Sequence, residues 1–567
     1  MKILLLTHSF NSLSQRIFVE LRQLGHQVSV EFDINDRVSI EAVELFRPDL
    51  IVAPFLKRAI PQEIWANRIC LVVHPGIRGD RGPSALDWAI LNRERHWGVT
   101  VIQANGEMDA GDIWASVEFP MREATKASLY RNEVTEGAVT AVLSAVARLQ
   151  QGGFTPEPLD YEKHNVRGLQ RPLVRQVDRA IDWQRDDSQT VLRKIRSGDG
   201  SPGVADRLFG RDCFLYDAHP GPALTGRPGE VIARSGPAVC RATVDGSILI
   251  GHLRDKLGEH PFKLPATRVL ASETAHLPEL EGYPEISYRE QNGVGYLHFN
   301  FYNGAMSSAQ CGRLCQAFIK ARQRDTKVIV LMGGQDFWSN GLHLNIIEAA
   351  ESAADESWFN INAINDLARE IINTQSHITV SALSGNAGAG GVFLARAADL
   401  VWVRSGVILN PHYKDMGNLY GSEYWTYLLP KRVGEERAVR ITQGRLPMGG
   451  MEASGLGLVN ACFERTVEAF VAALEKRAEA LADDRALAGM LSAKAARRVE
   501  HEREKPLAHY REEELARMQR NFYGFDPSYH VARYNFVYKV PKSRTPITLA
   551  NHRDLRKAPG RVRGEGS

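Results

Sequence analysis

Residues Ser384–Asp399 read SGNAGAGGVFLARAAD, and this stretch decides the fold of the second half of the chain. It follows an apolar run, Ile378–Leu383, that has the length and composition of a buried strand. Its glycines let the backbone approach a bound group closely, and the apolar residues after them predict a helix. Another short apolar run, Leu400–Val403, comes next. This alternation predicts an α/β domain with a binding turn at the end of a strand.

A second glycine-containing segment lies upstream, where Phe337–Asn345 reads FWSNGLHLN. The two segments, in this order, resemble the active-site framework of the crotonase (enoyl-CoA hydratase/isomerase) superfamily, and the resemblance extends over Gly293–Cys462. It implies that the chain holds a thioester of coenzyme A. It also implies an oxyanion hole made by the backbone N–H groups of Leu342 and Gly390, with Gly341 helping to hold the thioester.

The two glutamates that handle water and protons in the hydratases are absent here, because their positions fall on Phe393 and His412. The resemblance therefore implies a thioester site without hydration machinery. Nearby, Pro411–Trp425 reads PHYKDMGNLYGSEYW and is dense in groups that can move protons. We expect Tyr413 to act as hydrogen-bond donor or acid and Glu423 as base, with His412 as the other candidate base. The alternative is that these aromatic residues only pack and that Glu423 is an exposed helical residue.

The front of the chain also alternates apolar runs with amphipathic stretches, including a predicted helix over Leu13–Leu24. The predicted strands are Lys2–Thr7, Gln27–Phe32, Asp49–Ala53 and Ile69–Val73. This pattern predicts a parallel sheet with helices on both faces. Ligands of such sheets bind beyond the carboxyl ends of the strands, and His74 lies directly after the fourth run.

The segments around this histidine carry a second resemblance. His74–Leu91 reads HPGIRGDRGPSALDWAIL, and Gly98–Asp112 reads GVTVIQANGEMDAGD. Together they are similar to the catalytic core of the formyltetrahydrofolate-using enzymes, which include methionyl-tRNA formyltransferase. The resemblance implies 10-formyltetrahydrofolate as the formyl donor.

The same resemblance assigns roles to particular residues. His74 would stabilise a tetrahedral intermediate and exchange a proton, while Asp112 would tune His74 and relay that proton. Gly82 would shape the loop around the formyl group, and Phe55 and Leu56 would line the folate pocket.

One position departs from this family's pattern. The family has Asn-x-His, and the asparagine position is Val72 here. The lost amide normally helps to hold the formyl oxygen, so another donor is expected to substitute. Gln103 and Asn105 are the candidates, and the alternative for both is that they are solvent-facing loop residues.

Taken together, the sequence predicts an α/β multidomain protein. It would combine a Rossmann-like formyltransferase domain, a small OB-like β-barrel, and a crotonase-like α/β domain with C-terminal helices. The expected divisions are 1–165 for the formyltransferase-like domain, 170–270 for the barrel, 285–465 for the crotonase-like domain, 466–545 for a helical region and 546–567 for a solvated basic tail.

Composition excludes several classes of function. The 567 residues carry a net charge of only +3, so no overall electrostatic field favours nucleic acid as a partner. No apolar stretch has the length of a membrane span. The six cysteines form no CxxC pair, so we expect no metal site and a reducing, cytoplasmic location.

The two resemblances together suggest one pathway. Formyl would pass from 10-formyltetrahydrofolate to the thiol of coenzyme A, and formyl-CoA would then lose carbon monoxide. The whole arrangement resembles a family of hydrogenase maturation factors. That resemblance implies a role in supplying the CO ligand of nickel–iron hydrogenase, with hydrogenase maturation proteins or the hydrogenase large subunit as partners besides the small-molecule substrates.

Two other functions stay open at this point. The chain could be a formyltetrahydrofolate hydrolase whose back half senses coenzyme A. It could also be a non-catalytic scaffold for hydrogenase assembly. The gas released from formyltetrahydrofolate and coenzyme A would separate them, since only the first pathway yields CO.

Overall fold

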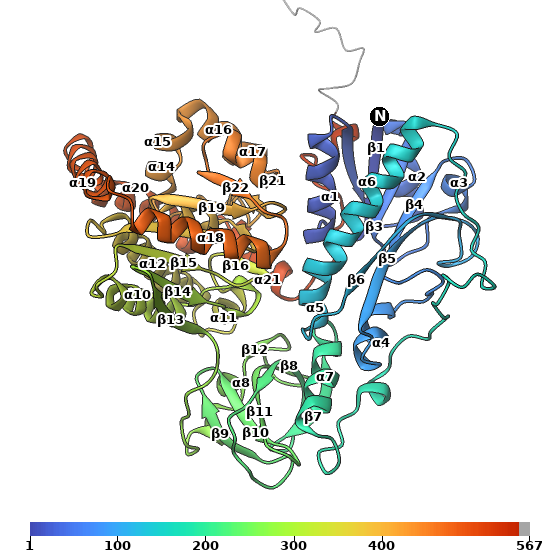
Figure 1. The fold of residues 1–567 in the computed structure, drawn as a ribbon, viewed down its shortest axis with the longest axis horizontal. Helices are drawn as coiled ribbons and strands as arrows, with labels where there is room; N and C mark the ends of the chain where they lie inside the picture. Colours follow the sequence, from blue (N-terminus) through green and yellow to red (C-terminus); the bar gives the residue numbers. More distant parts are fainter. Residues whose placement is uncertain (555–567) are drawn as a thin grey trace, which may run out of the picture.

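The computed structural model describes residues 1–554. Figure 1 shows an N-terminal lobe in blue, a small green lobe, and a third lobe in yellow-green to red that lies beside the first. Each lobe has its own sheet and its own buried core. None of the helices in residues 1–554 is both long and apolar enough to cross a membrane.

The first sheet has the strand order β2-β1-β3-β4-β5-β6. Its strands are β1 (Lys2–Thr7), β2 (Gln27–Phe32), β3 (Leu50–Phe55), β4 (Cys70–His74), β5 (His96–Gln103) and β6 (Ile113–Pro120). β1 to β4 are parallel, as expected, and β5 and β6, which the sequence did not predict as strands, add an antiparallel edge to the sheet. The antiparallel pair returns the chain toward the end of β4, where His74 is the last strand residue.

Helices cover both faces of this sheet, as the alternation predicted. They are α1 (Ser12–Gln23) and α6 (Thr135–Gln151) on one face, and α2 (Asp36–Phe46) and α3 (Gln62–Trp65) on the other. Because side chains alternate along a strand, Ile3 and Leu5 of β1 pack toward the first pair, while Leu4 and Leu6 pack toward the second.

The small lobe is an antiparallel sheet with the order β7-β8-β11-β10-β9, and β12 pairs with β11. Its strands are β7 (Val204–Leu208), β8 (Arg211–Pro220), β9 (Val231–Ser235), β10 (Ala238–Ala242), β11 (Ser247–Asp255) and β12 (Leu264–Pro265). One face packs on α7 (Ser188–Gly198) through Val191, Leu192 and Ile195. The β-rich unit expected in this region is therefore present.

The third lobe has two sheets. The larger one has the order β13-β14-β15-β17-β19-β22, and the smaller one the order β16-β18-β20-β21. The strands are β13 (Ile286–Gln291), β14 (Val294–Phe299), β15 (Val328–Met332), β16 (Phe337–Ser339), β17 (Ile378–Leu383), β18 (Asn386–Gly388), β19 (Leu400–Arg404), β20 (Ile408–Asn410), β21 (Met448–Gly449) and β22 (Ala461–Phe463).

Helices pack around these sheets and dominate the end of the chain. They include α10 (Ser308–Arg322), α12 (Ala353–Ile372), α13 (Gly390–Arg396), α18 (Val467–Ala482), α19 (Leu487–Glu504), α20 (Leu507–Tyr523) and α21 (Ser528–Val537). Pro506 separates α19 from α20, as expected, and serves as the N-cap of α20. Helix α20 packs on α12 and so reaches the interior of the third lobe.

Residues 545–553 return to the N-terminal lobe and cover the open edge of β2. The N–H of Val30 donates to the carbonyl of Leu549 at 3.0 Å. The wholly buried Glu31 carboxylate accepts from His552 at 3.0 Å and from Arg553 at 2.6 Å. The solvated tail expected for 546–567 is therefore wrong for this described part, and 555–567 lie outside the described residues.

Candidate functional sites

The first site is built around His74 at the end of β4, which is only 5% exposed. Its Nε2 lies 3.0 Å from Oδ2 of Asp80, a side chain that is wholly buried. Its Nδ1 lies 3.6 Å from Oδ2 of Asp109. Two carboxylates therefore hold the imidazole from opposite ring nitrogens and fix its orientation, which a proton-exchanging group requires.

The carboxylate expected beside His74 was Asp112, and this is wrong. Asp112 is exposed, and its main-chain carbonyl accepts from the N–H of Gln103 at 2.8 Å. Asp109 takes the place instead, because it has a left-handed backbone (φ 54°) that turns the loop back over the strand end. The N–H of Gly82 donates to Asp109 Oδ2 at 3.1 Å, so Gly82 shapes the loop by holding this carboxylate.

The connector after the first lobe closes over this site. The hydroxyl of Tyr161 donates to the carbonyl of Gly79 at 3.0 Å, and the N–H of Arg81 donates to the carbonyl of Leu169 at 3.2 Å. Arg171 lies 3.7 Å from the otherwise unpartnered Oδ1 of Asp80. A small cavity remains between the loop and the sheet, lined by His74, Ile77, Gly79, Asp80, Thr100, Ile102, Asp109, Ile113 and Leu159.

The two residues expected in the folate pocket lie near the same edge of the sheet. Phe55 is the last residue of β3 and Leu56 follows it. The ring of Phe55 meets the ring of Tyr130 edge-on, at 6.4 Å between centroids. This places Phe55 against the helical segment that faces the third lobe.

Neither candidate substitute for the missing asparagine contacts His74. Gln103 accepts a hydrogen bond from the indole N–H of Trp114 at 3.0 Å. Asn105 is exposed and accepts from the N–H of Glu107 at 2.8 Å. Val72 pairs with Ile102 in the sheet. In this structure Asp80 and Asp109 are the polar groups at the imidazole.

The second site forms where three short parallel strands end. β16, β18 and β20 pair side by side, so their carboxyl ends meet at one edge. Gly341 and Leu342 follow β16, and Gly390 follows β18 and begins α13. A Cβ on Gly341 would lie 3.3 Å from the N of Gly390, so the two segments touch. In residues 1–554 neither the Leu342 nor the Gly390 amide donates to another protein group, so both are free for a ligand oxygen.

The carboxylate of Glu423 lies at this edge. Its Oε2 accepts from the hydroxyl of Tyr413 at 2.5 Å and from the N–H of Ser422 at 3.3 Å. Its Oε1 is buried without a hydrogen-bond partner among the described residues and would lie 2.2 Å from a Cβ on Gly390. Burial raises the pKa of Glu423 to about 7. An unpartnered carboxylate oxygen thus lies beside Gly390, and the exposed-helix alternative for Glu423 is wrong.

The turn that carries Glu423 is strained. Glu423 and Tyr424 both have left-handed backbones, with φ of 59° and 58°. Ala389, which precedes Gly390, has φ 47° and ψ −125°. A non-glycine residue with such a backbone costs about 1–3 kcal/mol of conformational free energy. Strain of this kind clusters at functional sites.

A second buried carboxyl, Glu514 of α20, holds this turn, and the sequence reading did not find it. Its Oε2 accepts from the N–H of Tyr424 at 3.0 Å and from the hydroxyl of Ser422 at 3.1 Å. Its Oε1 accepts from the N–H and the hydroxyl of Thr426 at 2.9 and 2.6 Å. No local motif marks Glu514, because its partners are about 90 positions away in the chain.

The other two substituted positions lie near this group. The ring of Phe393 stacks on Tyr413, with centroids 5.3 Å apart and an interplanar angle of 17°. His412 is buried, its Nδ1 has no hydrogen-bond partner in the described chain, and burial lowers its pKa. A lowered pKa means that this imidazole binds a proton less tightly than Glu423 does, so it is a weaker candidate for the base.

Family models match three parts of the chain. The Enoyl-CoA hydratase/isomerase model matches residues 289–525, the Formyl transferase model 23–146 and the Formyl transferase, C-terminal domain model 174–260. The chain therefore carries formyltransferase and crotonase-type domains.

Relatives extend over the whole length. The hydrogenase maturation factor HoxX of Bradyrhizobium diazoefficiens is 57% identical over 566 residues, which are 100% of this chain and 99% of the relative. This chain belongs to the HypX/HoxX family of hydrogenase maturation factors. A crystal structure of HypX from Aquifex aeolicus in complex with tetrahydrofolic acid has 48% identity and a TM-score of 0.95, covering 98% of this chain and 100% of that one. A methionyl-tRNA formyltransferase of Synechococcus sp. is 28% identical over 222 residues, 37% of this chain and 67% of its own.

In this HypX/HoxX chain the two sites lie on lobes that are joined directly. Arg131, next to Tyr130, donates to Asp336 at 3.1 Å and to Asn303 at 3.3 Å in the third lobe. The side chain of Asn340 in turn donates to the carbonyl of Asn303 at 2.9 Å. A short path of contacts therefore runs from Phe55 and Tyr130 at the edge of the first sheet to the residue before Gly341.

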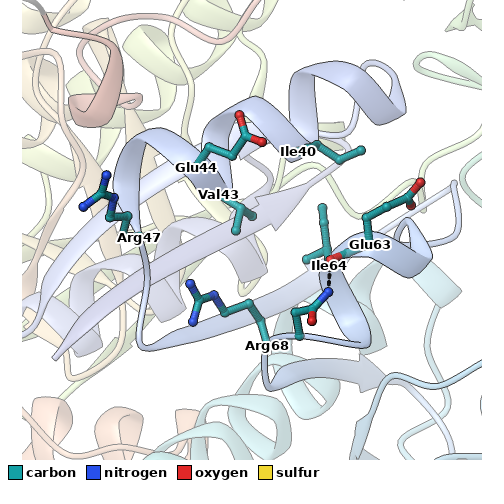
Figure 2. Close-up of a pocket in the computed structure, with 8 residues that line it drawn as sticks. Ile40, Val43, Glu44, Arg47, Glu63, Ile64 and Arg68 are labelled. Atoms are coloured by element: carbon teal, nitrogen blue, oxygen red, sulfur yellow. Dashed lines mark hydrogen bonds between the residues drawn. The ribbon is translucent and has the colours of Figure 1, made fainter.

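A further surface cavity lies away from both sites. Figure 2 shows it between α2 and α3 on the outer side of the N-terminal lobe, with Ile40, Val43 and Ile64 forming its apolar floor. Its volume is about 410 Å³, and Glu44 and Glu63 are among its charged residues. It holds none of the residues that the sequence singled out.

Proposed function

We propose that this HypX/HoxX family member makes carbon monoxide in two steps, by transferring formyl from 10-formyltetrahydrofolate to coenzyme A and then decarbonylating formyl-CoA. The observation that carries the second step is the unpartnered buried oxygen of Glu423 at the Leu342–Gly390 amide pair. The site keeps an oxyanion hole and a base but lacks both hydratase glutamates. A formyl thioester has no α-carbon, so enolate chemistry is excluded and loss of the formyl hydrogen remains.

In the first step His74 would act at the formyl carbon. The sulfur of coenzyme A adds to this carbon as its S–H proton passes to Nδ1 of His74, which then stabilises the tetrahedral oxyanion. The C–N bond then breaks, its electron pair leaves with the folate nitrogen, and that nitrogen takes the proton from His74. Asp80 holds Nε2 throughout, and Asp109, 3.6 Å from Nδ1, leaves that nitrogen free to exchange the proton.

In the second step Glu423 would take the formyl proton. The C–H electron pair stays on carbon as CO forms, and the C–S pair leaves with sulfur. Tyr413, whose hydroxyl donates to Glu423, supplies the proton that restores the thiol. The net change moves one proton from carbon to sulfur and needs no oxidant or reductant. The Leu342 and Gly390 amides hold the carbonyl oxygen meanwhile.

Two features of the chain support these small molecules. His74 and the strand end carrying Phe55 and Leu56 share one edge of the first sheet, which supports a folate that presents its formyl group there. The hydrogen bonds of Arg131 with Asp336 and Asn303 keep the two lobes side by side, which supports a coenzyme A arm that serves both sites. Such tethering raises the effective concentration of the labile formyl thioester.

Headspace analysis with 10-formyltetrahydrofolate and coenzyme A tests the proposal. We expect CO from the parent protein, and tetrahydrofolate without CO from Tyr413→Phe and Glu423→Gln. Formate without CO would favour the hydrolase, and no turnover would favour the scaffold. CO from both variants at the parent rate would show that the base and acid are elsewhere.

A further inference from the structure

Glu514 lies in the third lobe without a role in either proposed step, although it is wholly buried. It belongs to α20, which packs on α12. Four hydrogen-bond donors reach its two oxygens, from Ser422, Tyr424 and Thr426. A buried carboxyl that served only to support the fold would cost free energy of folding, because burying a charged group is unfavourable even when it is paired.

The donors of Glu514 all belong to the strained turn that aims Glu423. The N–H of Glu423 itself donates to Oδ1 of Asn365 on α12 at 2.8 Å. The amide of Asn365 donates to the hydroxyl of Ser422 at 2.8 Å, and that hydroxyl has Glu514 Oε2 at 3.1 Å and Asn365 Oδ1 at 3.0 Å as acceptors. Two helices thus hold three successive residues of the turn, and the left-handed backbone of Glu423 and Tyr424 persists only because of these contacts.

The two carboxyls also share an environment. Both accept hydrogen bonds from Ser422, Glu423 from its N–H and Glu514 from its hydroxyl. Burial raises the pKa of Glu514 to about 8, against the hydrogen bonds from Thr426, and the charge of Glu423 raises it further. Because the pKa of Glu514 lies above that of Glu423, Glu514 is still protonated where Glu423 ionises, and its contribution to the site is the set of hydrogen bonds that hold the turn.

We propose that Glu514 is a positioning residue of the thioester site, which fixes the turn that carries Glu423 through hydrogen bonds from Ser422, Tyr424 and Thr426. This inference rests on the proposed function of Glu423 as the base. The other ionisable groups facing the pair or its turn are Cys311, Tyr413, Tyr420, Tyr424 and Arg511.

Infrared difference spectroscopy tests this without turnover. The protonated carboxyl band of Glu423 is assigned by its loss in Glu423→Gln, and its titration midpoint is then followed. In Glu514→Leu, which removes both acceptor oxygens, we expect this midpoint to fall by about one pH unit, because the released turn lets water reach Glu423 and reduces the burial that raises its pKa. Glu514→Gln keeps an acceptor oxygen and is neutral like the protonated carboxyl, so it should return the midpoint toward that of the parent. The matched control is Glu512→Leu, an exposed neighbour on α20, which should leave it in place.

A midpoint that stays in place in a folded Glu514→Leu protein would overturn the proposal. Should that variant not fold, Ser422→Ala takes its place. It removes the hydroxyl that links the turn to Asn365 and Glu514, so the midpoint should again fall, and an unchanged value contradicts us. The pH profile of CO release should shift by the same amount while tetrahydrofolate release stays constant. A parent protein that makes no CO would sink the decarbonylation step, and the infrared titration would still decide the role of Glu514.

Discussion

At the scale of single residues, one backbone angle selects the partner of His74. Asp109 and Asp112 are three positions apart, and the left-handed backbone at Asp109 turns only the first toward the imidazole. We expect Asp109→Asn to slow tetrahydrofolate release by about 10²-fold, the lower range for losing a proton-managing group. Asp112→Asn should stay within about twofold, as for an exposed side chain. A larger loss of rate in Asp112→Asn would show that Asp112, and not Asp109, is the carboxylate that works with His74.

Glu423 gives the second step its own pH dependence. Burial raises its pKa from the ordinary value to about 7, so the carboxylate form needed to take the formyl proton increases as pH rises through 7. We expect CO release from preformed formyl-CoA to rise about tenfold for each unit of pH below this midpoint and to level off above it. Rates at matched ionic strength would measure this, and a rate independent of pH from 5 to 7 would contradict a carboxylate base.

The sequence predicted His74, Tyr413 and Glu423 as site residues because each lies inside a distinctive run of sequence. The structure brings Tyr413 and Glu423 into contact and places His74 at a strand end. The sequence did not identify Asp80 or Glu514. Burial and distant hydrogen-bond partners mark these two residues, and a local sequence pattern shows neither property. Asp112 was chosen wrongly because spacing does not reveal a left-handed backbone.

At the scale of elements, the second site depends on three strands only three residues long each. β16, β18 and β20 bring Gly341, Gly390 and Tyr413 to one edge. The sequence predicted the larger sheet through its long apolar runs, but such short strands carry no periodicity of their own. The antiparallel edge was missed for another reason: no helix lies between β5 and β6, and the helix α4 (Ala85–Leu91) between β4 and β5 does not bring β5 back parallel to β4.

Gly390 is the point where this edge admits no side chain. A Cβ there would lie 2.2 Å from Oε1 of Glu423 and would push the carboxylate away from the amide pair. We expect Gly390→Ala to lower CO release by about 10²–10³-fold, as for loss of an oxyanion-hole contact, with formyl transfer unchanged. The control is Gly489→Ala on α19, where a Cβ would meet no atom within 4 Å. Equal losses in both steps would mean that the variant had disturbed the fold rather than the site.

At the scale of the whole molecule, a buried network joins the second and third lobes. Asp217 of β8 accepts from His219 and from His252, each at 2.8 Å, and from Tyr283 at 2.5 Å. His252 stacks on Tyr302 of the third lobe with ring centroids 4.3 Å apart. Burial alone would raise the pKa of Asp217, but the hydrogen bonds from the two histidines outweigh it and hold the pKa below its ordinary value.

The sign of the resulting stability change follows from that direction. A lowered folded pKa stabilises the protein above the unfolded pKa, near pH 4, and this stabilisation is lost as pH falls. Between pH 6 and pH 3 the thermal midpoint of the parent should therefore fall by about 5 °C more than that of Asp217→Asn. Calorimetry at several pH values would measure it. Parallel curves for the two proteins would show that Asp217 does not contribute in this way.

The return of residues 545–553 to β2 has a consequence for synthesis. The partners Phe32 and Thr545 are 513 positions apart, so the outer edge of β2 stays bare while nearly all of the chain is still being translated. A bare strand edge is a template for unwanted pairing between nascent chains. The first lobe is therefore complete only after the end of the chain has been synthesised. A stop codon before Thr545 would leave the edge of β2 bare and the protein aggregation-prone, even though the first and third lobes had been made.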